Sequence, residues 1–141
     1  MSTPFAGHAP TFRAQTCIAP DRMAHLARDI SEEVHGGFPR AFIQFDGASP
    51  GQLSFSVRTR LTRTALMTFD LDITQRIDGF TSLRSTVCDA MPRGGQAPYL
   101  ASLTRPLGVE IYRRYTRELA SALARFDPLS TAVIVDPGHR P

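Results

Sequence analysis

The stretch that decides the fold begins at Leu53-Ser54-Phe55-Ser56-Val57-Arg58-Thr59-Arg60-Leu61, where apolar and polar side chains alternate. The alternation resumes at Met67-Thr68-Phe69-Asp70-Leu71-Asp72-Ile73 and, after Asp78-Gly79, at Leu83-Arg84-Ser85-Thr86-Val87. Because successive side chains of a strand point to opposite faces, a period of two indicates a half-buried strand. Three such segments in succession predict an antiparallel β-meander with one apolar face and one wet face.

The turns between these segments predict how the strands pair. A loop of about three residues near Arg63-Thr64-Ala65 would place Leu61 opposite Met67. The same register sets Arg58 opposite Asp70 on the wet face, as a cross-strand charge pair. The second turn, around 78–80, puts the next strand's inner residues on the same face as those of the first two strands: Thr81, Leu83, Ser85 and Val87.

Before the meander, the sequence predicts a strand, a helix and a second strand. Residues 12–18 alternate, and Ala19-Pro20-Asp21 ends this strand and opens a helix with Asp21 as its N-cap. The helix carries an apolar stripe and is stopped by Gly36-Gly37. Residues 41–45 form a short strand, which turn-forming residues follow at 46–51.

A long amphipathic helix is predicted after Pro106, from Leu107 to Arg125, and Asp127-Pro128 ends it. Its inner stripe consists of Val109, Tyr112, Thr116, Leu119, Leu123 and Phe126. For residues 131–135 a short strand and disorder remain equal alternatives. We therefore expect an α+β fold with a flexible tail at 1–10, a single domain at 11–127 and a C-terminal tail at 128–141.

Composition excludes some functions. The 141 residues carry a net charge of +3, and all sixteen basic residues are Arg, so a lysine Schiff base is excluded. The Arg residues are spread along the chain, which disfavours nucleic-acid binding. No apolar run approaches the roughly 20 residues of a membrane-spanning helix, and the first residues lack the pattern of a secretory signal. A cytoplasmic location is expected.

No residue is predicted to be catalytic, and neither a metal site nor a cofactor is predicted. Cys17 and Cys88, the only cysteines, fall in predicted strands and are interpreted as small buried hydrophobes. The four histidines are scattered without ligand spacing. Asp70 and Asp72 share the wet face, where a general acid is poorly placed.

The order of strand, helix, antiparallel meander and long C-terminal helix resembles the START-like superfamily, also called Bet v 1-like, SRPBCC or polyketide cyclase. The resemblance is carried by the strand-to-helix entry at 12–23, the meander from Leu53 to Val87 and the helix from Leu107 to Phe126. It covers most of residues 11–126. It implies a helix-grip fold, in which the sheet curves around the last helix and encloses an apolar cavity.

The resemblance implies binding of a small hydrophobic ligand that is lipid-, polyketide- or sterol-like. The residues expected to line the cavity are Phe55, Val57, Thr59, Phe69, Leu71, Ile73, Leu83, Ser85, Tyr112, Tyr115 and Leu119. One alternative is a cyclase or aromatase of the same superfamily, so the sequence does not decide whether the chain is an enzyme. Another is a protein-interaction module that uses the Arg-rich helix face of residues 113 to 125. A homodimer is compatible with either function.

Overall fold

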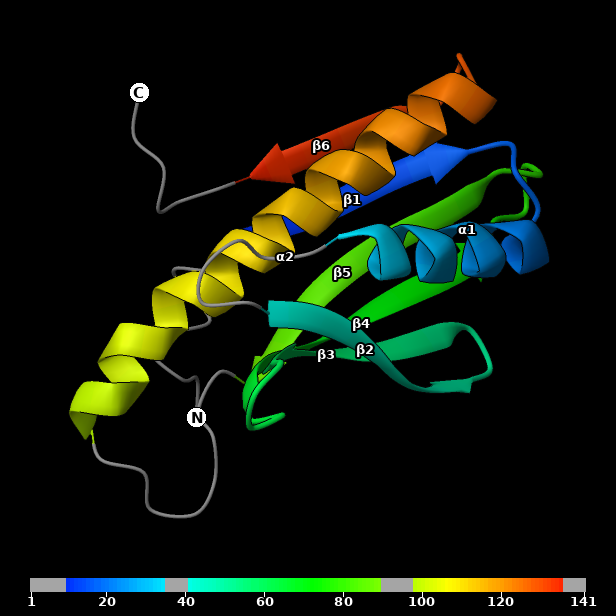
Figure 1. Cartoon of the computed structure of the whole chain (residues 1–141). Helices are drawn as coiled ribbons and strands as arrows, with labels where there is room; N and C mark the ends of the chain where they lie inside the picture. The colour runs from blue at the N-terminus through cyan, green and yellow to red at the C-terminus, as the bar shows by residue number, and fades with distance from the viewer. Residues whose placement is uncertain (1–9, 35–40, 90–97, 136–141) are drawn as a thin grey trace.

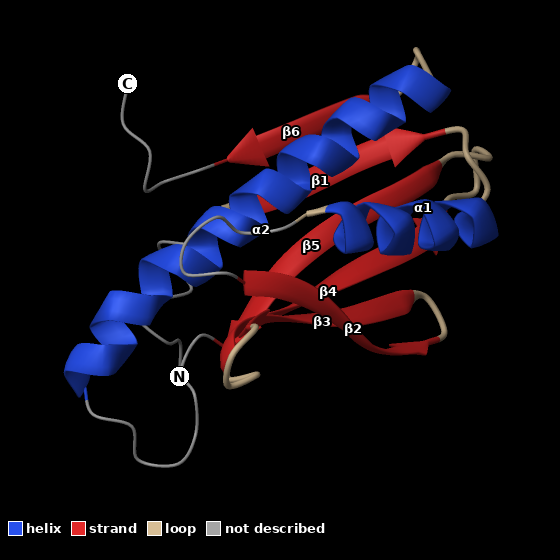
Figure 2. Ribbon diagram, viewed as in Figure 1, coloured by secondary structure: helices blue, strands red, loops and turns tan. Residues whose placement is uncertain are grey.

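The computed structural model describes residues 10–34, 41–89 and 98–135. Most of the predicted tail at 1–10 and the predicted stop at Gly36-Gly37 lie outside these ranges. The elements are, in order, β1 (Thr11–Thr16), α1 (Pro20–Glu33), β2 (Ala41–Ser49), β3 (Gln52–Thr59), β4 (Ala65–Gln75), β5 (Thr81–Asp89), α2 (Pro98–Phe126) and β6 (Thr131–Val135). The predicted α+β class is confirmed (Figure 2).

The strands form one open antiparallel sheet in the order β2-β3-β4-β5-β1-β6. The predicted meander is its centre, and β1 pairs with the meander's last strand. Both helices lie against the same face of the sheet, and α2 runs diagonally across it, contacting β2, β3 and β4 as well as β1 and β6 (Figure 1). Of the two alternatives for residues 131–135, the strand is the one observed, since β6 pairs with β1.

The predicted register between β3 and β4 is wrong, although the odd-numbered side chains from Leu53 to Val57 and from Met67 to Ile73 are buried as predicted. Val57 pairs with Met67, and Ser54 rather than Arg58 lies opposite Asp70. The turn is longer than predicted because Arg63 adopts a positive φ of 57° and its N–H bonds to the carbonyl of Thr59 at 2.9 Å. Leu61 therefore lies at the hairpin tip, 97% exposed. The error is an even number of residues, so the inward side chains stay inward.

Both helices differ from prediction at their ends. In α1, Ala19 is the N-cap and Pro20 opens the helix, which places Asp21 in the first turn. This suits proline, whose fixed φ and missing N–H are tolerated at the first helical position. The second helix begins at Pro98, so Pro106 lies within it instead of before it. Phe126, predicted to face inward, is 67% exposed where α2 ends.

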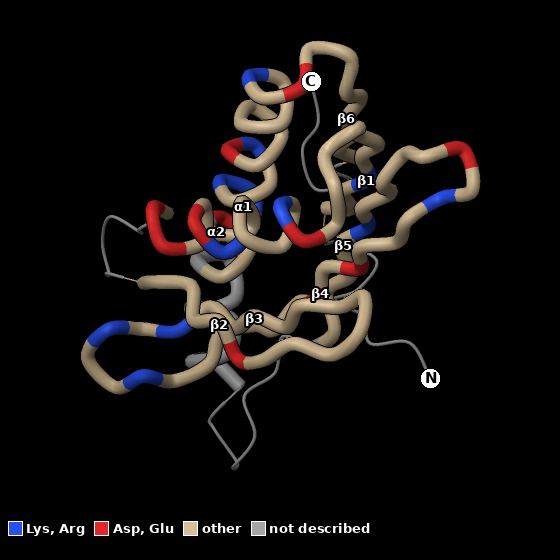
Figure 3. The backbone as a smooth tube through the Cα atoms, turned by 90° about the vertical axis from the view of Figure 1, so that its right-hand side faces the viewer, with Lys and Arg blue, Asp and Glu red and all other residues tan. Residues whose placement is uncertain are grey.

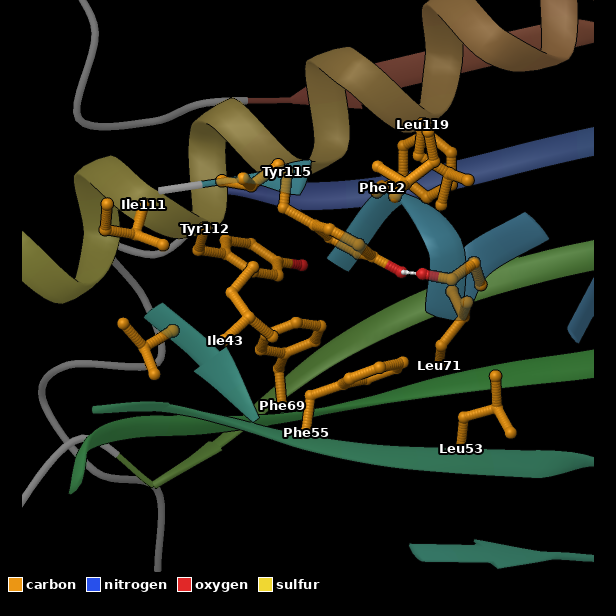
Figure 4. Packing of buried hydrophobic residues seen from close by; sticks show 14 of the residues in the cluster. Phe12, Ile43, Leu53, Phe55, Phe69, Leu71, Ile111, Tyr112, Tyr115 and Leu119 are labelled. Atoms are coloured by element: carbon orange, nitrogen blue, oxygen red, sulfur yellow. Dashed lines mark hydrogen bonds between the residues drawn. The ribbon is translucent and has the colours of Figure 1, made fainter. Parts of the chain in front are cut away.

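The core between sheet and helices is built from stacked aromatic rings (Figure 4). Phe55 and Phe69 stack with ring centroids 5.1 Å apart, and Phe69 meets Tyr112 edge-on at 4.9 Å. Tyr115 lies tilted against both phenylalanines. A Cβ built on Gly108 would lie 3.3 Å from the Cβ of Leu66, so glycine lets α2 approach β4 closely.

Candidate functional site

Ten of the eleven residues expected to line a cavity come together beneath α2. They are Phe55, Val57, Phe69, Leu71, Ile73, Leu83, Ser85, Tyr112, Tyr115 and Leu119, and each is buried. Their rings contact one another directly. Thr59 lies apart, at the end of β3, where its hydroxyl is 2.7 Å from that of Thr62 in the turn.

Two hydroxyls meet inside this apolar surrounding. Ser85 Oγ on β5 and Tyr112 Oη on α2 are 2.5 Å apart, and the residues are 3% and 0% exposed. A hydrogen bond between two hydroxyls uses one of their two protons. The second proton has no acceptor among the described residues. The pair therefore presents one unused O–H donor in a buried position.

Tyr112 keeps its proton over the physiological range. Burial raises its pKa from 10.0 to about 12, and the bond with Ser85 opposes this rise only in part. A phenol in this state donates a hydrogen bond but does not act as a base near neutral pH. The pair is consequently suited to recognising a neutral acceptor oxygen.

The remaining inner hydroxyls are satisfied within the chain. Tyr115 Oη donates to the carbonyl of Ala27 at 3.0 Å and so ties α2 to α1 (Figure 4), and burial raises the pKa of this phenol. Thr81 Oγ1 donates to the carbonyl of Ile18 at 2.7 Å. These hydroxyls have structural roles, which distinguishes them from the Ser85–Tyr112 pair.

A hollow of about 480 Å³ is lined by residues of β1, β5 and β6, and Ser85, Phe12 and Val87 belong to its lining. A second hollow of about 390 Å³ adjoins it, since Arg13, Arg84 and Val133 line both. Sequence reasoning missed these surfaces because β6 was only one of two alternatives for residues 131–135.

A third hollow, of about 590 Å³, lies between α1 and the end of α2. Ile18, Leu26 and Phe126 supply its apolar wall, and His25 and Asp29 stand beside them. No sequence pattern predicts this hollow, because the helical spacing places Phe126 on the inner stripe of the last helix.

The outer face of the meander is a polar surface. Asp70 accepts from Ser54 Oγ at 2.9 Å and from Cys88 Sγ at 3.0 Å. Both cysteines are exposed, so their interpretation as buried hydrophobes is wrong. Cys17 follows the last residue of β1, and Cys88 points outward from β5 because Val87, the residue before it, packs against the core.

Cationic side chains occur on two other surfaces. Arg113 on α2 pairs with Glu110 at 3.5 Å. In the β3–β4 hairpin, whose arginines are coloured in Figure 3, Arg60 and Arg63 lie over the ring of Phe42. Among the described residues, no three His, Cys, Asp or Glu side chains are grouped closely enough to hold a metal ion. None of the described helices has the length and apolarity needed to span a membrane.

Comparison with known proteins gives little. No family model matches the sequence, and no curated protein matches it. Among solved structures, the chain is similar to a conserved protein from Geobacillus kaustophilus at 14% sequence identity and a TM-score of 0.31. The match covers 79% of this chain and 96% of that one.

Proposed function

We propose that this chain is a START-like, helix-grip binding module for a small, neutral, largely apolar molecule that carries a hydrogen-bond acceptor. The observation that supports the proposal is the unused hydroxyl proton of the Ser85–Tyr112 pair, which is buried beneath α2. The order of elements and the placement of both helices on one sheet face are compatible with that superfamily.

The chemistry of the pair restricts the ligand. A buried donor without an acceptor costs free energy, so an acceptor oxygen that reaches it is favoured. Phe12, Phe69 and Val87 surround the same part of the inner face, which favours an apolar body for the ligand.

Binding is favoured over catalysis by the state of Tyr112. A pKa of about 12 keeps the phenol protonated, so it orients an acceptor without taking up a proton itself. The ligand class that fits is a ketone, ester or ether with an apolar frame.

The test is displacement of a neutral environment-sensitive dye, Nile red, by a panel of apolar ketones and esters, with native mass spectrometry of the purified chain. Tyr112→Phe and Ser85→Ala are each expected to weaken binding about tenfold, the effect of losing one buried hydrogen bond. Tyr115→Phe is the matched control, because its hydroxyl is already bonded to Ala27. No dye binding and no retained molecule, or equal affinities in all variants, would overturn the proposal.

A further inference from the structure

β6 (Thr131–Val135) is the last strand of the sheet, and only one of its sides pairs with another strand, β1. Its other side presents a row of backbone N–H and C=O groups that pair with no strand among the described residues. All five of its side chains are exposed. The strand contains neither a charged residue nor a proline, the two features that most often protect such an edge.

Seven large hydrophobic side chains of the described residues are exposed, and three of them, Val133, Ile134 and Val135, lie in β6. Phe126 and Leu129 precede the strand, and Phe126 lines the hollow between α1 and the end of α2. The other two, Leu61 and Ile77, stand singly at hairpin tips. A grouping of this kind marks an interaction surface, whereas single exposed apolar residues are ordinary. In Figure 3, β6 carries neither basic nor acidic colour.

The opposite edge of the same sheet is protected. In β2, a bulge between Phe45 and Gly47 interrupts the ladder and carries the exposed carboxylate of Asp46. The guanidinium of Arg28 covers the ring of Phe45 at 4.2 Å. Bulges and charges of this kind prevent pairing with another chain. The contrast between the two edges identifies β6 as the one that accepts a partner strand.

We propose that β6 pairs antiparallel with β6 of a second copy of this chain, about a two-fold axis at Val133. This register is self-complementary, as a two-fold interface requires. Val133 faces its own symmetry mate, Thr131 faces Val135, and Ala132 faces Ile134. β-Branched pairs of this kind favour cross-strand packing, and no like charges oppose each other within the strand. The sheet then continues across both copies, with both α2 helices on one side.

Measurement of mass against concentration tests the pairing. A five-residue strand buries less than the about 1,200–2,000 Å² of a standard interface, so dissociation in the micromolar range is expected. Light scattering after gel filtration is expected to move from the 15.5 kDa of one chain to twice that mass between about 1 and 100 µM. Val133→Lys sets like charges opposite each other and is expected to give a monomer throughout.

Ile77→Lys is the matched control, because Ile77 is also fully exposed but lies at the β4–β5 turn. It is expected to leave the dimer unchanged. A monomer at every concentration overturns the proposal, as does a dimer that survives Val133→Lys or is lost in Ile77→Lys.

Cross-linking tests the register in a background of Cys17→Ser and Cys88→Ser, which removes the two exposed thiols. Directly opposed residues of an antiparallel pair have Cα atoms about 4.5–5.5 Å apart, within reach of a disulfide. Val133→Cys is expected to cross-link to itself on oxidation. Thr131→Cys is expected to cross-link when mixed with Val135→Cys but not alone. Cross-linking of Thr131→Cys to itself, or none by Val133→Cys, overturns the assigned register.

Discussion

The carboxylate of Asp127, just beyond the end of α2, accepts a hydrogen bond of 2.8 Å from the hydroxyl of Thr16 at the end of β1. The same oxygen accepts the backbone N–H of Cys17 at 2.7 Å, and the other oxygen accepts the N–H of Leu129 at 3.1 Å. One buried carboxylate thus joins the first strand to the turn that leads into β6. The bonds connect segments that are 111 residues apart in the sequence.

The first prediction concerns acid stability. The N–H of Cys17 and then the hydroxyl of Thr16 hold the pKa of Asp127 below its ordinary value. A carboxyl with a depressed folded-state pKa contributes stability above its unfolded pKa of about 3.9, and loses it as the pH falls through the folded value. Asp127→Asn is therefore expected to lower the urea midpoint at pH 7 and to flatten its decline in acid.

The control for this prediction is Asp78→Asn, which removes a carboxylate that is half exposed in its pair with Arg76. An exposed ion pair contributes little, so its urea midpoint should follow that of the wild type. An unchanged acid profile in Asp127→Asn would show that the carboxylate is not the link between β1 and α2.

The second prediction is a coupling between Ser85 and Tyr112. Removing one hydroxyl leaves the other buried and unbonded, so Tyr112→Phe or Ser85→Ala is expected to cost about 1–3 kcal/mol of unfolding free energy. The double variant leaves no orphaned hydroxyl and should cost less than the sum of the two. Urea denaturation of the four proteins measures this coupling. Additive costs would show that the 2.5 Å contact contributes nothing.

The alternation within β3, β4 and β5 was sufficient to predict their core-facing apolar side chains, because the period of two survives an even error in register. It failed for Leu61, which lies in the β3–β4 turn. It was not sufficient to predict the register, since that depends on the positive φ of Arg63, and arginine is not typical of such a position. Ser85 and Tyr112 were both predicted as site residues. Their direct contact depends on how α2 crosses β5, which no local pattern encodes.

The edge strand β6 illustrates another limit of prediction from sequence. Thr131–Val135 is apolar and β-branched, which is the composition of a strand, but two prolines follow closely. Only its tertiary pairing with β1 decides between strand and disorder. Cys17 and Cys88 were wrongly assigned to the interior for a related reason. Small residues are often buried, but in an alternating strand the position decides the face.

The third prediction is an alkaline transition. Burial raises the pKa of Tyr112 from 10.0 to about 12 and raises that of Tyr115 as well. A group whose pKa is higher in the folded state than in the unfolded state contributes its full stability below the unfolded-state pKa. This contribution is lost as the pH rises toward the folded-state pKa. Unfolding free energy is expected to fall between pH 10 and 12, with tyrosinate absorbance appearing as the chain unfolds. In Tyr112→Phe the loss of unfolding free energy between pH 10 and 12 should be smaller than in the wild type. An identical decline would contradict the raised pKa of Tyr112 as its cause.

The fourth prediction concerns the reactivity of Cys88. Partial burial, the bond to Asp70 and the charge of Asp70 raise its thiol pKa to about 12. Because the thiolate is the reactive form, Cys88 is expected to react slowly with a disulfide reagent at pH 8 although it is exposed. Asp70→Asn in a Cys17→Ser background should accelerate the reaction, while Asp78→Asn should not. Equal rates in these variants would exclude control by Asp70.

The fifth prediction compares two glycines in the β2–β3 hairpin. Gly51 has a positive φ of 77°, and a Cβ there would lie 3.3 Å from the carbonyl oxygen of Ile73. The backbone of Ile73 is held close, because its N–H donates to the carbonyl of Gly51 at 2.8 Å. Gly51→Ala therefore adds backbone strain and a contact with main chain that cannot move aside, and a loss of about 1–2 kcal/mol is expected.

Gly47, in the β2 bulge, is the matched control for this substitution. A Cβ at Gly47 meets nothing within 4 Å, and its φ lies outside the left-handed region. Gly47→Ala should consequently leave stability unchanged or raise it by less than about 1 kcal/mol, through the smaller entropy of the unfolded chain. Thermal and urea denaturation of the pair give the comparison. If Gly51→Ala is as stable as Gly47→Ala, the turn does not require glycine, and the β2–β3 register rests on the strand pairing alone.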